Sequence, residues 1–297
     1  MQPITQYYRV GDHVFAIEAT QEQFAQLPNY APFLIDIHAD GIAPTHVFII
    51  HVTDEPLPPV EGWEHVYTDR SDEDMPRIEM YQKANEWLFR VSLSRDGDIV
   101  SAMRCAADWT EVHLYLLPDY TRFAIDNAAM LVYAFRTTAL NTLLFHSSVT
   151  VRGGKGYMFL GHSGTGKSTH SQQWKAAFPD AELLNDDNPV VRIMPDETVR
   201  VYGSPWSGKT PCYKASDVPV AALVQLAQAP ENIIHRLKMT QAYPYILASV
   251  SGLKLQPQMM DRLYKTIAKL LELSPVYKLE CLPNPDAARL CAQTCLS

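Results

Sequence analysis

The sequence predicts an α/β protein of the α+β type, in which a smaller β-rich domain precedes a domain built around a phosphate-binding loop. Three observations carry this prediction. The first part of the chain is rich in β-branched and aromatic residues, and helical spacing of apolar residues begins only near Phe123. The glycine-rich stretch 161–169 then follows an apolar strand. We place the boundary so that the two domains are residues 1–122 and 123–297.

Length and composition limit the class of protein. The chain of 297 residues, of which 47% are hydrophobic, suffices for about two domains with buried cores. Its net charge of −8 offers no basic surface for nucleic acid, and no apolar run is long enough for a membrane span. We therefore expect neither a nucleic-acid nor a membrane partner. The absence of a signal-peptide pattern and the odd, scattered set of five cysteines predict a cytoplasmic protein with reduced thiols.

Strand patterns dominate the first domain. Residues 6–19, 87–94 and 100–117 carry β-branched and aromatic residues with partial alternation. The stretch 54–76 is rich in proline and acidic residues, which predicts a loop. From residue 124 to 144 few helix breakers occur and apolar residues recur at helical spacing, so this helix is expected to open the second domain. The first domain receives no assigned role.

A hairpin is expected directly before the glycine-rich stretch. Residues 143–151 and 156–160 are strand candidates, and Gly153-Gly154 between them suits a two-residue turn. In a tight hairpin centred on these glycines, His146 lies opposite Gly161. This register makes His146 a candidate for contact with bound phosphate, while a histidine that merely packs at the end of a strand is the alternative.

The stretch GHSGTGKST carries the strongest chemical signal. It matches the pattern G-x-x-x-x-G-K-[ST] and lies between an apolar strand and a plausible helix over 167–178, which is the setting that this motif requires. Backbone N–H groups of such a loop surround phosphates, the lysine neutralises the outer phosphates, and the serine hydroxyl binds Mg²⁺. A glycine turn with an exposed lysine is the alternative. The expected nucleotide-binding residues are Gly161, His162, Ser163, Gly164, Thr165, Gly166, Lys167, Ser168 and Thr169.

Two adjacent carboxylates follow the helix and a short strand at 181–185. In a right-handed crossover this strand runs parallel to the strand before the loop, so Asp186 and Asp187 leave it on the edge that carries the loop. One carboxylate can hold Mg²⁺ and the other can accept a proton from an attacking hydroxyl. The alternative is an Asp-Asp turn before Pro189.

The stretch 202–213, YGSPWSGKTPCY, predicts a further loop. Gly203, Pro205 and Gly208 mark it, and Lys209 follows the last of these glycines. Lys209 is a candidate second cation for a transferring phosphoryl group. A surface turn with an exposed lysine explains the composition equally well.

These motifs resemble a known group of nucleotide sites. GHSGTGKSTHS followed by NDDN is similar to the site of phosphoenolpyruvate carboxykinases and HPr kinase/phosphorylases, in which an Asp-Asp pair follows the loop after one helix and strand. FHSS at 145–148 resembles the histidine-containing strand of HPr kinases. YGSPWSGK and the tail at 274–290 resemble less characterised HPr kinase-related proteins, some of them associated with peptide-modification gene clusters. The resemblance covers residues 140–297, and the loop and Asp-Asp motifs that carry it lie within 156–190.

The resemblance implies a fold and roles for individual residues. It implies the carboxykinase/HPr kinase-type phosphate-loop fold for the second domain. Asp186 takes the place of the proton-accepting aspartate, Asp187 and Ser168 the places associated with metal, and His146 the place near the transferred phosphate. The segment with which HPr kinases hold their protein substrate and the carboxykinase residues for oxaloacetate are not found, so neither substrate is predicted.

The sequence thus predicts a Mg²⁺-dependent phosphotransferase that uses ATP. A hydroxyl, above all that of serine, is the expected acceptor, on a protein, a peptide or a small molecule. Asp186, His146, Lys167 and Lys209 are the candidate catalytic residues. Two other functions stay open: a carboxykinase-like enzyme acting on a small organic acid, and a nucleotide-binding accessory protein that switches a partner without kinase activity. The sequence also leaves open whether the chain forms a homo-oligomer.

Overall fold

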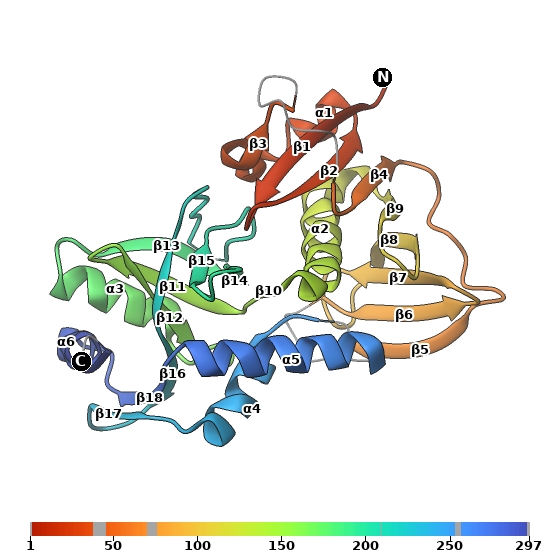
Figure 1. Ribbon diagram of the computed structural model, residues 1–297. Coiled ribbons are helices and arrows are strands. Elements are labelled where there is room, and N and C mark those ends of the chain that lie inside the picture. The colour runs from red at the N-terminus through yellow and green to blue at the C-terminus, as the bar shows by residue number, and fades with distance from the viewer. Residues whose placement is uncertain (1, 38–45, 70–75, 209, 253–256, 296–297) are drawn as a thin grey trace. The chain divides into compact units, whose positions relative to one another are not determined.

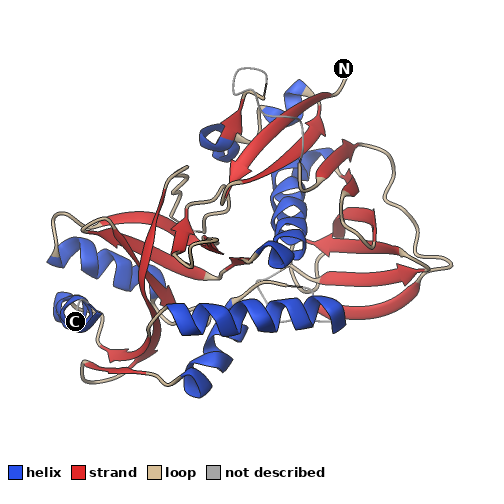
Figure 2. Cartoon of the chain, viewed as in Figure 1, coloured by secondary structure: helices blue, strands red, loops and turns tan. Residues whose placement is uncertain are grey.

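The computed structural model describes residues 2–37, 46–69, 76–208, 210–252 and 257–295. The chain divides into two compact units, Met1–Arg136 and Thr137–Ser297 (Figure 1). Strands outnumber helices in both units, and each unit contains one large mixed sheet (Figure 2). The predicted α/β class and the β-rich character of the N-terminal part are therefore confirmed at this coarse level.

The first unit is a nine-stranded sheet in the order β3-β1-β2-β4-β9-β8-β7-β6-β5. Parallel pairing joins β2 to β4 and β4 to β9, whereas the other neighbours are antiparallel. The described elements of this unit are β1 (Ile4–Val10), β2 (His13–Ala19), α1 (Gln21–Phe24), η1 (Pro28–Phe33), β3 (Leu34–Ile35), β4 (Ile49–Thr53), β5 (Glu64–Asp69), β6 (Ile78–Lys83), β7 (Glu86–Ser92), β8 (Ile99–Ala106), β9 (Glu111–Leu116), η2 (Pro118–Tyr120) and α2 (Thr121–Thr137).

Helix α2 packs on the sheet of the first unit instead of opening the second. The Tyr133 hydroxyl donates to the carbonyl of Val10 at 2.8 Å, and the Phe135 ring lies edge-on to Trp109. The division at Arg136 therefore differs from the expected boundary at residue 122. An apolar helical stripe predicts a buried face but does not identify the sheet that buries it.

The loop expected over residues 54–76 contains a strand. β5 pairs antiparallel with β6, so the loop prediction is wrong for Glu64–Asp69. Residues 70–75 lie outside the described part of the chain. Among the described strands β5 is the last of the sheet, and its exposed Val66 and Tyr67 have β6 as their one neighbouring strand there. A strand at an edge needs little apolar alternation, which explains why the acidic, proline-rich composition hid it.

The second unit also contains a nine-stranded sheet. Seven strands follow the order β10-β14-β15-β16-β12-β11-β13, and β18 joins β16 and β17 beside them. The described elements are η3 (Thr138–Leu140), β10 (Thr142–Leu144), β11 (Ser147–Arg152), β12 (Lys155–Leu160), α3 (Lys167–Ala177), β13 (Glu182–Asp187), β14 (Val190–Ile193), β15 (Val199–Tyr202), β16 (Asp217–Gln228), β17 (Ile233–Arg236), α4 (Met239–Ser249), α5 (Pro257–Leu273), β18 (Val276–Cys281) and α6 (Pro285–Cys295).

Helices cover both faces of the central strands in this unit. Side chains alternate along β12, so Tyr157 and Phe159 join a core with Trp174 of α3 and with α6. Met158 and Leu160 point to the opposite face, where they join a core with α4 and α5. The unit is therefore a three-layer arrangement in which the strand before the glycine-rich loop is buried on both sides.

Strand register brings three candidate residues to one edge of the sheet. β11 and β12 form the predicted hairpin, with Ser147 opposite Leu160. β11 also pairs antiparallel with β13, and there Ser147 lies opposite Asp187. β13 consequently runs parallel to β12, as expected from the sequence, although β11 lies between them. His146 immediately precedes β11, Gly161 immediately follows β12, and Asp187 ends β13. All three therefore lie where these neighbouring strands begin or end, on the same side of the sheet.

Candidate functional site

The glycine-rich loop turns sharply into α3. Gly166 has φ +103° and forms the cap before the first helical residue, a conformation that strains residues with a Cβ atom. A Cβ atom at Gly161 would lie 2.9 Å from the Thr165 side chain. The loop therefore brings the N-terminus of an eleven-residue helix to the edge of the sheet. The first N–H groups of that helix have no partner within the helix and can bind an anion.

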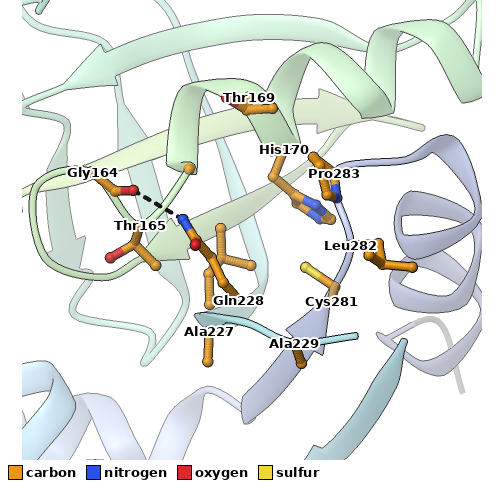
Figure 3. A pocket seen from close by; sticks show the side chains of 12 residues that line it. Gly164, Thr165, Thr169, His170, Ala227, Gln228, Ala229, Cys281, Leu282 and Pro283 are labelled. Carbon is orange, nitrogen blue, oxygen red and sulfur yellow. Dashed lines mark hydrogen bonds between the residues drawn. The ribbon is translucent and has the colours of Figure 1, made fainter. Parts of the chain in front are cut away.

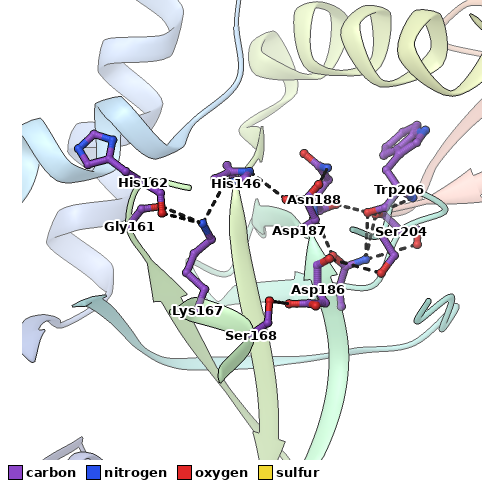
Figure 4. Close-up of polar contacts among 12 residues, drawn as sticks. His146, Gly161, His162, Lys167, Ser168, Asp186, Asp187, Asn188, Ser204 and Trp206 are labelled. Atoms are coloured by element: carbon purple, nitrogen blue, oxygen red, sulfur yellow. Dashed lines mark hydrogen bonds and ion pairs between the residues drawn. The ribbon is translucent and has the colours of Figure 1, made fainter. Parts of the chain in front are cut away.

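Lys167 lies over the loop without an acidic contact. Its Nζ atom donates to the carbonyl of Gly161 at 2.9 Å and that of His162 at 3.3 Å, and it lies 2.9 Å from Nε2 of His146 (Figure 4). Burial lowers the pKa of Lys167, and the charges of Asp187 and Asp186 oppose this shift. Among the described residues no carboxylate bonds to the ammonium group, which suits it to an incoming phosphate.

His146 links the lysine to the second aspartate. Its Nδ1 atom lies 3.0 Å from Oδ1 of Asp187. A protonated Lys167 donates to Nε2, so a neutral imidazole carries its proton on Nδ1 and donates to the carboxylate. The other oxygen of Asp187 accepts from the Asn188 amide at 2.8 Å. The side chain of Asp187 is 34% exposed and is therefore accessible to a substrate.

Ser168 and the first aspartate form a separate pair. The Ser168 hydroxyl donates to Oδ1 of Asp186 at 2.9 Å. Asp186 is buried, and its second oxygen has no hydrogen bond within the described residues. A hydroxyl and a buried carboxylate oxygen are the hard donors that Mg²⁺ prefers, so this pair fits that ion. Among the described residues, no group of three or more acidic, histidine or cysteine side chains is placed to hold a metal ion.

Asn185 is a residue of the site that we did not predict. It is fully buried, its amide donates to Ser204 Oγ at 3.1 Å, and its carbonyl accepts from the backbone of Asn188 at 3.0 Å. The Ser204 hydroxyl in turn donates to the carbonyl of Asn188 at 2.6 Å. Asn185 therefore ties the end of β13 to the loop after β15. The sequence signal is its place directly before two aspartates, which by itself assigns no role.

Asp187 has an uncommon backbone conformation. Its φ of +146° lies in the region that favours glycine, and a β-bridge to Ser207 and the hydrogen bond from Gly208 N–H to Asp186 O support the neighbouring backbone. Such conformations persist where the surrounding structure enforces them, and they often occur at functional sites. The loop that we expected at 202–213 therefore supports the aspartates, while Lys209 lies outside the described residues.

A cavity of about 640 Å³ lies beside the glycine-rich loop, at the ends of β16 and β18 (Figure 3). Gly164, Thr165, Gly166 and Thr169 form its polar side. Gln228 also lines the cavity, and its side-chain amide donates to the carbonyl of Gly164 at 3.2 Å. The rest of the wall is largely apolar and consists of His170, Leu226, Ala227, Ala229, Cys281, Leu282 and Pro283. A largely apolar cavity with a few polar groups, beside a glycine-rich loop, is of the kind that takes a small-molecule ligand.

The expected site residues thus fall into three groups. Lys167, His146 and Asp187 are connected, and Ser168 and Asp186 are connected. Gly164, Thr165, Gly166 and Thr169 border the cavity. His162 and Ser163 border a shallower hollow of about 450 Å³, and only the His162 carbonyl contacts Lys167.

A scan against protein-family models found no match to this chain, and a search of curated proteins found no similar sequence. Among the described residues, no helix combines the length and apolarity needed to cross a membrane.

Proposed function

We propose that this chain is an ATP- and Mg²⁺-dependent phosphotransferase of the HPr kinase-like class, with a hydroxyl, above all that of serine, as acceptor. The observation that carries the proposal is the convergence of Lys167, His146 and Asp187 with the Ser168–Asp186 pair at the N-terminus of α3. Phosphoryl transfer requires positioning and neutralisation of charge, and this arrangement supplies both.

The phosphate side consists of α3 and Lys167. The first N–H groups of α3 bind the phosphates, and Lys167 exchanges a carbonyl partner for a phosphate oxygen. Ser168 ligates Mg²⁺ and Asp186 supports the ion directly or through water, because the two side chains already share a hydrogen bond. The ion, when bound, neutralises charge on the transferred and leaving oxygens.

The acceptor side consists of Asp187 and His146. Asp187 is the more accessible carboxylate and bonds to no metal-ligating hydroxyl, so we assign proton acceptance to it. His146 orients the carboxylate through Nδ1 and lies between it and the Lys167 ammonium group. This division reverses the one that the resemblance implied, in which Asp186 accepts the proton and Asp187 supports the metal.

In the proposed reaction, the acceptor oxygen attacks the γ-phosphorus while its proton passes to Asp187. The bond between the γ-phosphorus and the bridging oxygen breaks, and ADP leaves with the electron pair. Lys167 and the N-terminus of α3 bind the charge that develops on the phosphoryl oxygens.

The proposal is tested with γ-labelled ATP. The purified chain and a cell extract are incubated with Mg²⁺, and labelled acceptors are identified. We expect a serine-containing acceptor whose label, above that of the extract alone, is strong with the wild type and much weaker with Lys167→Ala. Phosphate release without any labelled acceptor would favour the accessory switch protein, and labelled organic acid would favour the carboxykinase-like enzyme.

A further inference from the structure

His170, the fourth residue of α3, occupies an unusual place. It is only 3% exposed, and its ring lies edge-on to Phe159 with a centroid distance of 4.6 Å. It also lines the apolar cavity, and Figure 3 shows the imidazole extending from α3 toward the segment that carries Cys281 and Leu282. A polar ring therefore lies in a wall made mostly of apolar side chains.

The hydrogen bond from Trp174 fixes the tautomer of this histidine. The indole N–H donates to Nε2 of His170 at 3.1 Å. An indole nitrogen can only donate, so Nε2 must be unprotonated and the proton of the neutral ring must lie on Nδ1. Burial lowers the pKa of His170 to about 4, so the ring is neutral at physiological pH.

The Nδ1–H group of His170 has no hydrogen-bond partner among the described residues. A buried donor without an acceptor costs free energy, and most buried polar groups in native proteins have a partner. Because His170 lines a cavity next to the glycine-rich loop, a ligand in that cavity can supply the missing acceptor.

We propose that the cavity takes the nucleoside moiety of the nucleotide and that His170 donates from Nδ1 to an acceptor atom of that nucleoside. The inference rests on the proposed function, because a nucleotide must occupy the loop. Thr169 precedes His170 at the start of the same helix, so a ligand that continues from the loop into the cavity passes both residues. His170 is then a residue that selects a nucleotide over a bare polyphosphate.

Two substitutions separate the two ring nitrogens. In His170→Gln the side-chain amide reaches the position of Nε2, so it can accept from Trp174 but has no donor at the position of Nδ1. In His170→Asn the amide lies near Nδ1, which retains the donor and loses the acceptor for Trp174. Calorimetry on the full chain, with Mg²⁺, measures the affinity of each variant for ATP and for inorganic tripolyphosphate.

We expect His170→Gln to bind ATP about three- to tenfold more weakly than the wild type, the scale of one hydrogen bond, and to bind tripolyphosphate equally well. His170→Asn should retain more ATP affinity than His170→Gln. Equal ATP affinity of wild type and His170→Gln, or an equal loss for both ligands, would overturn the inference. If the wild type binds tripolyphosphate and ATP equally, the cavity takes no nucleoside although the phosphotransferase proposal survives. If it binds neither, both proposals fail.

Discussion

The hydroxyl of Ser168 donates to Asp186 across 2.9 Å, whereas Asp187 bonds to His146. Adjacent aspartates therefore face different partners, and asparagine substitutions should separate their roles. Asp187→Asn should keep Mg·ATP binding while transfer falls about 10²- to 10⁴-fold, the scale of a lost general base. Asp186→Asn should raise the Mg²⁺ requirement. Mg²⁺ titrations of binding and turnover measure both effects. The opposite pattern would restore the roles that the resemblance implied, and two unimpaired variants would remove the chemical basis of the proposal.

Lys167→Ala should weaken Mg·ATP binding by about 10- to 100-fold, because it removes a charge-assisted hydrogen bond to a phosphate. Its present partners are two carbonyls and an imidazole, so the substitution breaks no ion pair among the described residues. Calorimetry with ATP gives the affinity. Lys155→Ala, at the exposed hairpin turn, is the matched control and should bind like the wild type. Equal affinities of wild type and Lys167→Ala would show that the loop is not the nucleotide site.

His146→Ala should reduce the rate of transfer more than it reduces nucleotide affinity, because it frees both Lys167 and Asp187 from their common partner. The neighbouring exposed His162 provides the control, since its contact with Lys167 runs through the backbone carbonyl. Steady-state kinetics should therefore show a lower kcat for His146→Ala and nearly unchanged constants for His162→Ala. A matched loss in both variants would indicate a general disturbance of the loop.

Asn185→Ala should lower the free energy of unfolding by about 1–3 kcal/mol, because the buried Ser204 hydroxyl and the Asn188 N–H lose a partner. Transfer should fall with it, since the same contacts hold the backbone beside Asp187. Urea unfolding and kinetics measure the two effects. Asn85→Ala, at an exposed turn of the first unit, should change neither. Unchanged turnover in a destabilised Asn185→Ala would limit Asn185 to a structural role.

His170 gives a prediction for pH. Burial lowers its pKa from 6.5 to about 4, so the folded state resists protonation. The stability that the neutral His170 ring gives to the folded state is complete above pH about 6.5 and is lost as the pH falls toward about 4. Between pH 7 and 5, the wild type should therefore lose about 2 kcal/mol more unfolding free energy than His170→Gln, which has no titrating group there. Urea unfolding at both pH values tests this difference, and parallel losses would contradict it.

The register at the site was predictable because it depends on local sequence. Gly153 and Gly154 fix a tight hairpin, and the pairing of Ser147 with Leu160 has the expected register. His146 and Gly161 are the residues next to this last pair. The direction of β13 followed from the crossover rule, although β11 between it and β12 was not foreseen. Short-range turn chemistry and chain direction are properties that a single sequence expresses well.

Other features depended on tertiary contacts that no local pattern expresses. The bond between Asn185 and Ser204 joins residues far apart in the chain, and only the folded sheet brings them together. His170 looked like an ordinary helical residue, because the orientation of its Nδ1–H depends on Trp174 and on the cavity wall. Helix α2 showed a buried face in its sequence, but its partner sheet could be identified only from the structure.

The loop after β15 has a second consequence, for solubility. β13 ends its row of strands, so its outer edge would offer free backbone groups to another chain. The backbone N–H of Gly208 donates to the carbonyl of Asp186. The Cys212 thiol donates to the carbonyls of Leu183 and Leu184. The loop therefore blocks intermolecular strand addition at the strand that carries both aspartates. Substitutions that detach this loop from β13 would therefore expose the strand to aggregation and displace the aspartates at the same time. Variants of the loop that are inactive but still soluble should accordingly be rare.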